Sequence, residues 1–105
     1  MSPTAMDRLY GCYLQHVNSL NEHAAKMPAR YGGSEEVWRL RVLTQAEFDE
    51  NLRRTSRNPK VKVAWLHRIL LKANDSARVT ILREIINLVD APSSSLLLKS
   101  LPHAA

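Results

Sequence analysis

Seven apolar side chains near the N-terminus recur at alternating intervals of four and three residues. They are Met6, Tyr10, Tyr13, Val17, Leu20, Ala24 and Met27. This spacing places all of them on one side of an α-helix, so the sequence predicts a helix from about Ala5 to Met27. Thr4 and Asp7 are spaced as in a capping box, in which each side chain bonds the backbone N–H of the other residue. Pro28 then ends the helix.

The stretch from Ser34 to about Thr55 allows more than one interpretation. We expect one continuous helix that Ser34 caps, with apolar residues such as Val37 and Phe48 on one face. The alternation of apolar residues with arginines in residues 38–42 is typical of a short strand instead. The sequence Thr44-Gln45-Ala46-Glu47 is also a capping box, which favours a new helix from that point.

The second half of the chain repeats helical spacing. Pro59 suits a first helical turn, and apolar residues in a helical pattern then predict a helix from Lys60 to about Ala73. The segment Asn74-Asp75-Ser76 either caps a new helix or forms a polar turn within a long one. The apolar face then continues to Asp90, and Pro92 is expected to end it. Residues 93–105 form a leucine-containing tail that is expected to dock rather than move freely.

The predicted fold class is all-α, a three-helix antiparallel bundle with room for a fourth short helix or a broken third helix. A chain of 105 residues is expected to form one small domain, here residues 1–92 followed by the tail. No run of about 18 apolar residues occurs, so we expect no membrane span. A single cysteine, Cys12, excludes an internal disulfide and a thiolate zinc cluster, and suits a reducing compartment.

Basic side chains are concentrated in one part of the chain. Residues 1–50 hold five basic and seven acidic side chains, whereas residues 51–105 hold ten basic and three acidic ones. The stretch from residue 51 to residue 74 has no acidic residue, and its basic residues are Arg53, Arg54, Arg57, Lys60, Lys62, Arg68 and Lys72. A block of one sign attracts an oppositely charged partner and speeds the encounter. The sequence therefore predicts an acidic partner, and solvated helix faces are the alternative explanation.

The residues that enzymes use are sparse. His16 and His23 lie seven positions apart on the first predicted helix, a rise of about 10 Å, which is too far for both to bind one metal ion without other ligands. The sequence contains no glycine-rich phosphate loop, metal-binding motif or nucleophile signature. We therefore expect a protein that is not an enzyme and that carries no covalently bound cofactor.

Arg41 falls at an unusual position. On a continuous second helix it lies close to the apolar line through Val37 and Phe48. A charged group there must extend outward or meet an anion. A guanidinium at the mouth of an apolar groove is suited to a phosphate, because its planar fork can bond two oxygens. In a strand-like or shifted register, Arg41 would lie in water instead.

Several short motifs follow one another in a characteristic order. Leu9-Tyr10 stands early in the first predicted helix, Phe48 is followed three residues later by Asn51, and a basic connector covers residues 53–59. Over roughly residues 5–90 this order resembles the LYR-motif proteins, a family of small mitochondrial proteins with a Leu-Tyr-Arg tripeptide in the first of three helices. Gly11 stands where that tripeptide has arginine, and the arginine usual just before the Phe is also absent.

The resemblance implies that the chain binds the mitochondrial acyl carrier protein, which is small and strongly acidic. The carrier would supply an acyl-4'-phosphopantetheine arm that enters the helical interior, and the basic block would face the carrier's acidic helix. The resemblance further implies an accessory subunit or assembly factor of a respiratory-chain complex, notably complex I, in the mitochondrial matrix or on the matrix side of the inner membrane. The predicted partner-binding residues are Leu9, Tyr10, Arg39, Arg41, Phe48, Arg53, Arg54, Arg57, Lys60, Arg68 and Lys72.

Two other functions remain open from the sequence. The basic residues could contact successive phosphates of a nucleic acid, as in a small dimeric protein that binds double-stranded RNA. The block has Trp65 as its one aromatic residue and matches no named DNA-binding module. A structural subunit whose basic face is buried in an unrelated large assembly is the third possibility.

Overall fold

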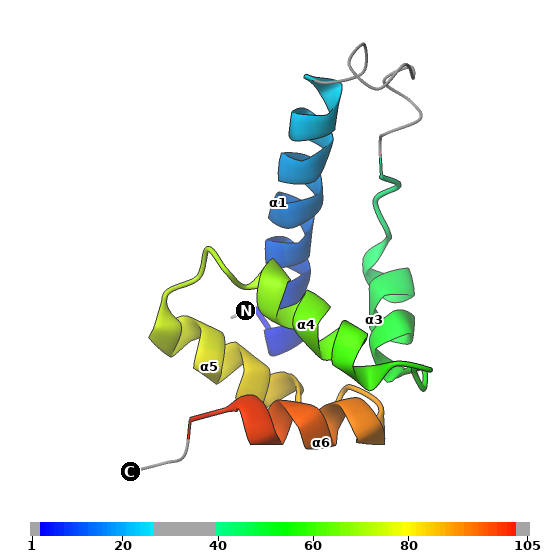
Figure 1. Cartoon of the computed structure of the whole chain (residues 1–105). Helices are drawn as coiled ribbons and strands as arrows, with labels where there is room; N and C mark the ends of the chain where they lie inside the picture. Colours follow the sequence, from blue (N-terminus) through cyan, green and yellow to red (C-terminus); the bar gives the residue numbers. More distant parts are fainter. Residues whose placement is uncertain (1–2, 27–39, 103–105) are drawn as a thin grey trace.

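The computed structural model describes residues 3–26 and 40–102. This part of the chain is all-helical, and its helices are α1 (Ala5–Ala25), α3 (Gln45–Arg53), α4 (Pro59–Ile69), α5 (Asp75–Ile85) and α6 (Ala91–Ser100). The long helix α1 packs against α3, α4 and α5, and α6 packs against α4 (Figure 1). The prediction of an all-α chain is confirmed, whereas these five helices exceed the number expected for a three-helix bundle.

Local capping chemistry sets the start of every described helix. Thr4 and Asp7 form the predicted capping box at α1, and Thr44 and Glu47 form a second one at α3. Single side chains cap the other helices, namely Asn58 at α4, Asn74 at α5 and Asp90 at α6. Each of these side chains accepts a bond from a backbone N–H that the helix leaves without an intrahelical partner.

The second predicted helix differs most from the structure. Residues 40–44 are not helical and form no strand, and α3 begins only after Thr44. The capping box at Thr44 therefore decides the helix start, because it satisfies two backbone N–H groups that a continuous helix would pair internally. Both the continuous helix and the short strand are wrong for residues 40–44. Their earlier residues, from Ser34 onward, lie outside the described part of the chain.

The predicted long third element is broken, and the tail continues as a helix. Helix α4 ends at Ile69, and Asn74 caps α5, which is the first of the two alternatives for that segment. Pro92 lies in the first turn of α6 rather than after the last helix, a position that tolerates proline because no N–H is needed there. Leu97 of α6 is fully buried, so this part of the tail docks as expected.

The hydrophobic core lies where α1 meets the other helices. Its buried members are Leu9, Tyr13, Val17, Phe48, Leu52, Val63, Leu66, Ile69, Leu70, Ile81, Leu82, Ile85, Val89 and Leu97. One ion pair lies beside it, because Lys62 bonds the Asp90 carboxylate and the Leu52 carbonyl oxygen, the latter at 3.2 Å. The Lys62 and Asp90 side chains are only 11% and 2% exposed. Among residues 3–26 and 40–102, no helix is long and apolar enough to cross a bilayer.

Candidate functional site: an apolar groove beside a tethered strap

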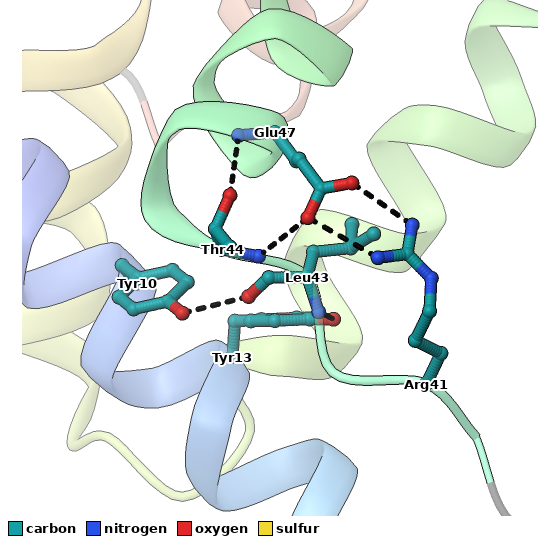
Figure 2. Close-up of polar contacts among 6 residues, drawn as sticks. All are labelled: Tyr10, Tyr13, Arg41, Leu43, Thr44 and Glu47. Carbon is teal, nitrogen blue, oxygen red and sulfur yellow. Dashed lines mark hydrogen bonds and ion pairs between the residues drawn. The ribbon is translucent and has the colours of Figure 1, made fainter.

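Residues 40–44, here called the strap, run antiparallel along α1 and are held there by its side chains. Near one end, Asn21 accepts a hydrogen bond from the Leu40 N–H at 2.6 Å and donates one to the Leu40 carbonyl oxygen at 3.1 Å. Near the other end, the Leu43 N–H donates to the Tyr13 hydroxyl at 2.9 Å (Figure 2). The Tyr10 hydroxyl donates to the Leu43 carbonyl oxygen at 2.7 Å. Side chains of α1 thus replace the backbone partners that a neighbouring strand would provide.

Arg41 projects from the strap toward the start of α3. Its guanidinium makes a two-pronged contact with the Glu47 carboxylate, with N–O distances of 2.9 and 3.2 Å (Figure 2). Hydrogen bonds from Arg41 and from the Thr44 N–H hold the pKa of Glu47 at about 2, well below its usual value. The Arg41 side chain is 70% exposed. The anion that Arg41 meets is therefore part of the chain itself, and the strap leaves this arginine in solvent rather than on a helix face.

An aromatic cluster lies behind the strap. Tyr10 and Tyr13 of α1 meet Phe48 of α3 at ring-centroid distances of 5.7 and 4.8 Å. Trp65 of α4 completes the cluster, 5.5 Å from Phe48 and 6.0 Å from Tyr13. Tilted and edge-to-face contacts at these separations are favourable for aromatic rings. The cluster joins three helices and gives the strap a fixed surface to lie on.

Two hollows flank this region and meet at His16, Leu20 and Arg68, and we call them together the α1–α4 groove. Their volumes are about 300 and 400 Å³. The first is lined by Cys12, Gln15, His16, Ser19, Leu20, Arg68, Ile69, Leu71, Lys72 and Ala73. The second is lined by Tyr13, His16, Val17, Leu20, Leu40, Arg41, Leu43, Trp65 and Arg68. Most of these side chains are apolar, and none of them is acidic.

The cations of the groove come from the strap, from α4 and from the turn that follows α4. Arg41 is neutralised by Glu47, but among the described residues no acidic side chain lies within ion-pair distance of Arg68 or Lys72. Leu20 and Leu71 remain 42% and 64% exposed beside them. Burial raises the pKa of the Cys12 thiol, which keeps that group neutral. The groove is therefore an apolar trough with positive charge at its rim.

The structure places the predicted site residues in several different environments. Leu9 and Phe48 are fully buried in the core, and Tyr10 donates a hydrogen bond to the strap. Arg53 and Arg54 pair within α3 with acidic residues one turn earlier, Asp49 and Glu50. Arg57 and Lys60 are exposed near the start of α4, away from the groove. Arg41, Arg68 and Lys72 come together at the groove, and Arg39 lies outside the described residues.

Sequence reasoning missed the apolar lining and the tethers. Leu20 was assigned to the apolar stripe of the first predicted helix, but its side chain is 42% exposed and lines the groove. Asn21 and Tyr13 carried no recognisable signal, because their partners are backbone atoms about 20 and 30 residues away. Leu71, between Arg68 and Lys72, could have indicated the groove from the sequence, because a large apolar residue on a charged helix face often marks a binding surface.

Comparisons with known protein families, with curated proteins and with solved structures found no match for this chain.

Proposed function

We propose that this protein is a non-catalytic helical subunit that binds an acidic acyl carrier protein and accepts its acyl-4'-phosphopantetheine arm in the α1–α4 groove. The observation that carries the proposal is the combination of an apolar groove with cations at its rim and no acidic side chain among the described residues that line it. A groove of this size is in the range of small-molecule sites. The order of motifs that resembles the LYR-motif family supports the same function.

The groove offers different chemistry for each part of such an arm. Leu20, Ile69 and Leu71 supply apolar surface for an acyl chain, whose removal from water is favourable in proportion to its buried area. Arg68 at the junction of the two hollows can bond two phosphate oxygens, and Lys72 adds a second cation. Leu9 and Phe48 have no exposed surface, so the groove, and not the centre of the core, receives the chain in this proposal.

The wider setting of the protein rests on the resemblance alone. We propose that the chain works in the mitochondrial matrix, or on the matrix side of the inner membrane, as an accessory subunit or assembly factor of a respiratory complex such as complex I. Binding of the acyl chain would stabilise the folded chain by mass action, because the unfolded chain has no groove to bind it.

The first test measures affinity for an acyl carrier protein by calorimetry, with the carrier in its long-acyl form and in its unacylated phosphopantetheine form. We expect tighter binding of the acylated form. The double variant Arg68→Glu/Lys72→Glu should weaken binding by about tenfold or more, a change of roughly 1.4 kcal/mol. The matched control is Arg83→Glu/Lys99→Glu, which changes the net charge equally on exposed positions of α5 and α6 and should bind like the parent chain.

A second variant tests the groove rather than its charge. Leu20→Trp places a larger side chain in the part of the groove that both hollows share. It should remove the preference for the acylated carrier while leaving binding of the unacylated carrier nearly unchanged. Equal affinity of the parent chain for both carrier forms would contradict the proposed site. Absence of binding to either form would contradict the function.

The nucleic-acid alternative has a direct test. Four exposed cations near α4 have no acidic partner among the described residues, which is the feature that would favour phosphate binding. A duplex of about 20 base pairs titrated at low salt should show at most weak binding if the carrier proposal is right. Tight binding that falls steeply with salt would favour the alternative, and binding of neither partner would favour an unrelated assembly subunit.

A further inference from the structure

One face of α4 and its flanks carries only basic and small or aliphatic residues. These residues, which we call the basic stripe, are Arg57, Lys60, Val61, Ala64, Arg68, Leu71 and Lys72, and all seven are exposed. The four stripe positions that lie within α4 fall in an arc of about 100° around the helix axis. The opposite face of the same helix buries Val63, Leu66 and Ile69. The stripe is therefore the solvent side of a helix whose other side is core.

The four cations of the stripe differ from the other basic residues of the same block. Arg53 and Arg54 are paired with Asp49 and Glu50, and Lys62 is buried against Asp90. Among the residues that the structure describes, no acidic group lies within ion-pair distance of Arg57, Lys60, Arg68 or Lys72. The positive charge of the stripe is thus not neutralised by the described part of the chain.

Large aliphatic side chains stand between these cations. Val61 is 62% exposed and Leu71 is 64% exposed, the two highest values among the large apolar residues of the described chain. The stripe covers sixteen residues from Arg57 to Lys72, and its helical part, from Lys60 to Arg68, is about 12 Å long at helical rise. Exposed aliphatic residues among unpaired cations combine two kinds of attraction, one for anions and one for an apolar phase.

We infer that the basic stripe docks this protein on the surface of a bilayer that contains anionic phospholipid. The cations face the lipid phosphates, and Val61 and Leu71 enter the boundary between headgroups and acyl chains. A nucleic acid satisfies the cations equally well, but its phosphate backbone offers no apolar partner for the two aliphatic side chains. The stripe lies flat on the bilayer and does not cross it.

This docking has a geometric consequence for the α1–α4 groove. Arg68, Leu71 and Lys72 belong both to the stripe and to the groove lining. A bilayer beneath the stripe therefore lies next to the mouth of the groove. Arg57, Lys60 and Val61 belong to the stripe alone, so substitutions there separate lipid docking from any function of the groove.

The test is flotation of the full chain with vesicles of neutral phosphatidylcholine, alone or with about a third of an anionic phospholipid. We expect binding to the anionic vesicles at low salt and little binding to the neutral ones. Arg57→Glu/Lys60→Glu should weaken vesicle binding by tenfold or more, and Val61→Ser/Leu71→Ser should weaken it at unchanged net charge. The control Arg83→Glu/Lys99→Glu should bind like the parent chain. Circular dichroism verifies folding, and Arg57→Gln/Lys60→Gln replaces the reversal if that variant unfolds.

Several results would overturn the inference. They are equal binding to neutral and anionic vesicles, no binding at low salt, an equal loss in the control, or no effect of the serine pair. Binding to a 20-base-pair duplex that exceeds vesicle binding would assign the stripe to nucleic acid instead. The outcome is separable from the proposed function, because Arg57→Glu/Lys60→Glu leaves the groove lining intact and can be assayed for carrier binding in parallel.

Discussion

Gly11 occupies a helical position that does not require glycine. It lies within α1, and beyond its chain neighbours and the nearby backbone of its own helix an added Cβ atom would meet no atom within 4 Å. Glycine in a helix interior is about 1 kcal/mol less favourable than alanine. We expect Gly11→Ala to raise the free energy of unfolding by about that amount, measured by urea denaturation. Gln15→Gly, on an exposed position of the same helix, should lower it, and a loss of stability in Gly11→Ala would show a constraint that the structure does not contain.

The low pKa of Glu47 predicts that acid destabilises the start of α3. Its pKa in the folded chain is about 2, against 4.5 without its partners, chiefly because Arg41 bonds the carboxylate. A lowered pKa contributes stability that is complete above the unfolded value and is lost as the pH falls from about 4.5 toward 2. Titration of the Glu47 side chain by NMR should show the low pKa directly. In Arg41→Gln the midpoint should rise toward 4.5, and an unchanged midpoint would contradict the pairing.

At the scale of elements, two tyrosines of α1 hold the strap by bonding different backbone atoms of Leu43. Tyr13→Phe keeps the ring in the aromatic cluster but removes the acceptor of the Leu43 N–H. A lost hydrogen bond of this kind weakens the local structure by about 1 kcal/mol, so the Leu43 amide should exchange with solvent about fivefold faster. Tyr10→Phe removes the donor to the Leu43 carbonyl and should affect that amide less. Equal acceleration in both variants would show that the strap opens as a unit.

Helix positions were predictable from the sequence wherever the local signals agreed with one another. The apolar spacing and capping box of α1 predicted its extent to within two residues at the C-terminal end. Between Ser34 and Thr55, apolar spacing and a second capping box predicted different helix starts, and the capping box decided it at Thr44. The strap itself was not predictable, because it is held by side chains of α1 that are distant in sequence.

At the scale of the whole molecule, the Lys62–Asp90 pair joins the end of α3, the first turns of α4 and the start of α6. Burial acts to raise the pKa of Asp90, but hydrogen bonds from Lys62 and Ser93 outweigh it and hold the pKa below its usual value. The Asp90 N–H also donates to the Leu52 carbonyl oxygen at 3.2 Å. Lys62 was counted in the basic block of the sequence, but in the structure it forms a buried ion pair that links three helices.

We expect Lys62→Met to lower the free energy of unfolding by about 3–5 kcal/mol, because it leaves the Asp90 carboxylate buried without its cation. Lys60→Met, two residues earlier on the exposed face, should change it by less than about 0.5 kcal/mol. Urea denaturation of both variants gives the comparison. Similar values for the two lysines would mean that the Lys62 contacts contribute little.

The basic residues of the candidate site were predictable from the sequence, but the groove that they border was not. Arg68 and Lys72 were identified from the one-signed block, and the structure places both at the rim of a groove. The groove depends on which part of α1 the other helices leave uncovered, and this is a property of packing that no local pattern encodes.

Because α1 supplies side chains to the tethers and the strap supplies backbone atoms, the two segments should tolerate substitutions to different degrees. Every tether runs from a side chain of α1 to a backbone atom of residues 40–43. Replacing Leu40 or Leu43 leaves the backbone atoms in place, whereas replacing Tyr10, Tyr13 or Asn21 removes a bond outright. In a saturation mutagenesis library selected for folding, α1 should therefore accept few substitutions at these three positions, whereas Leu40 and Leu43 should accept more without a change in the path of the strap.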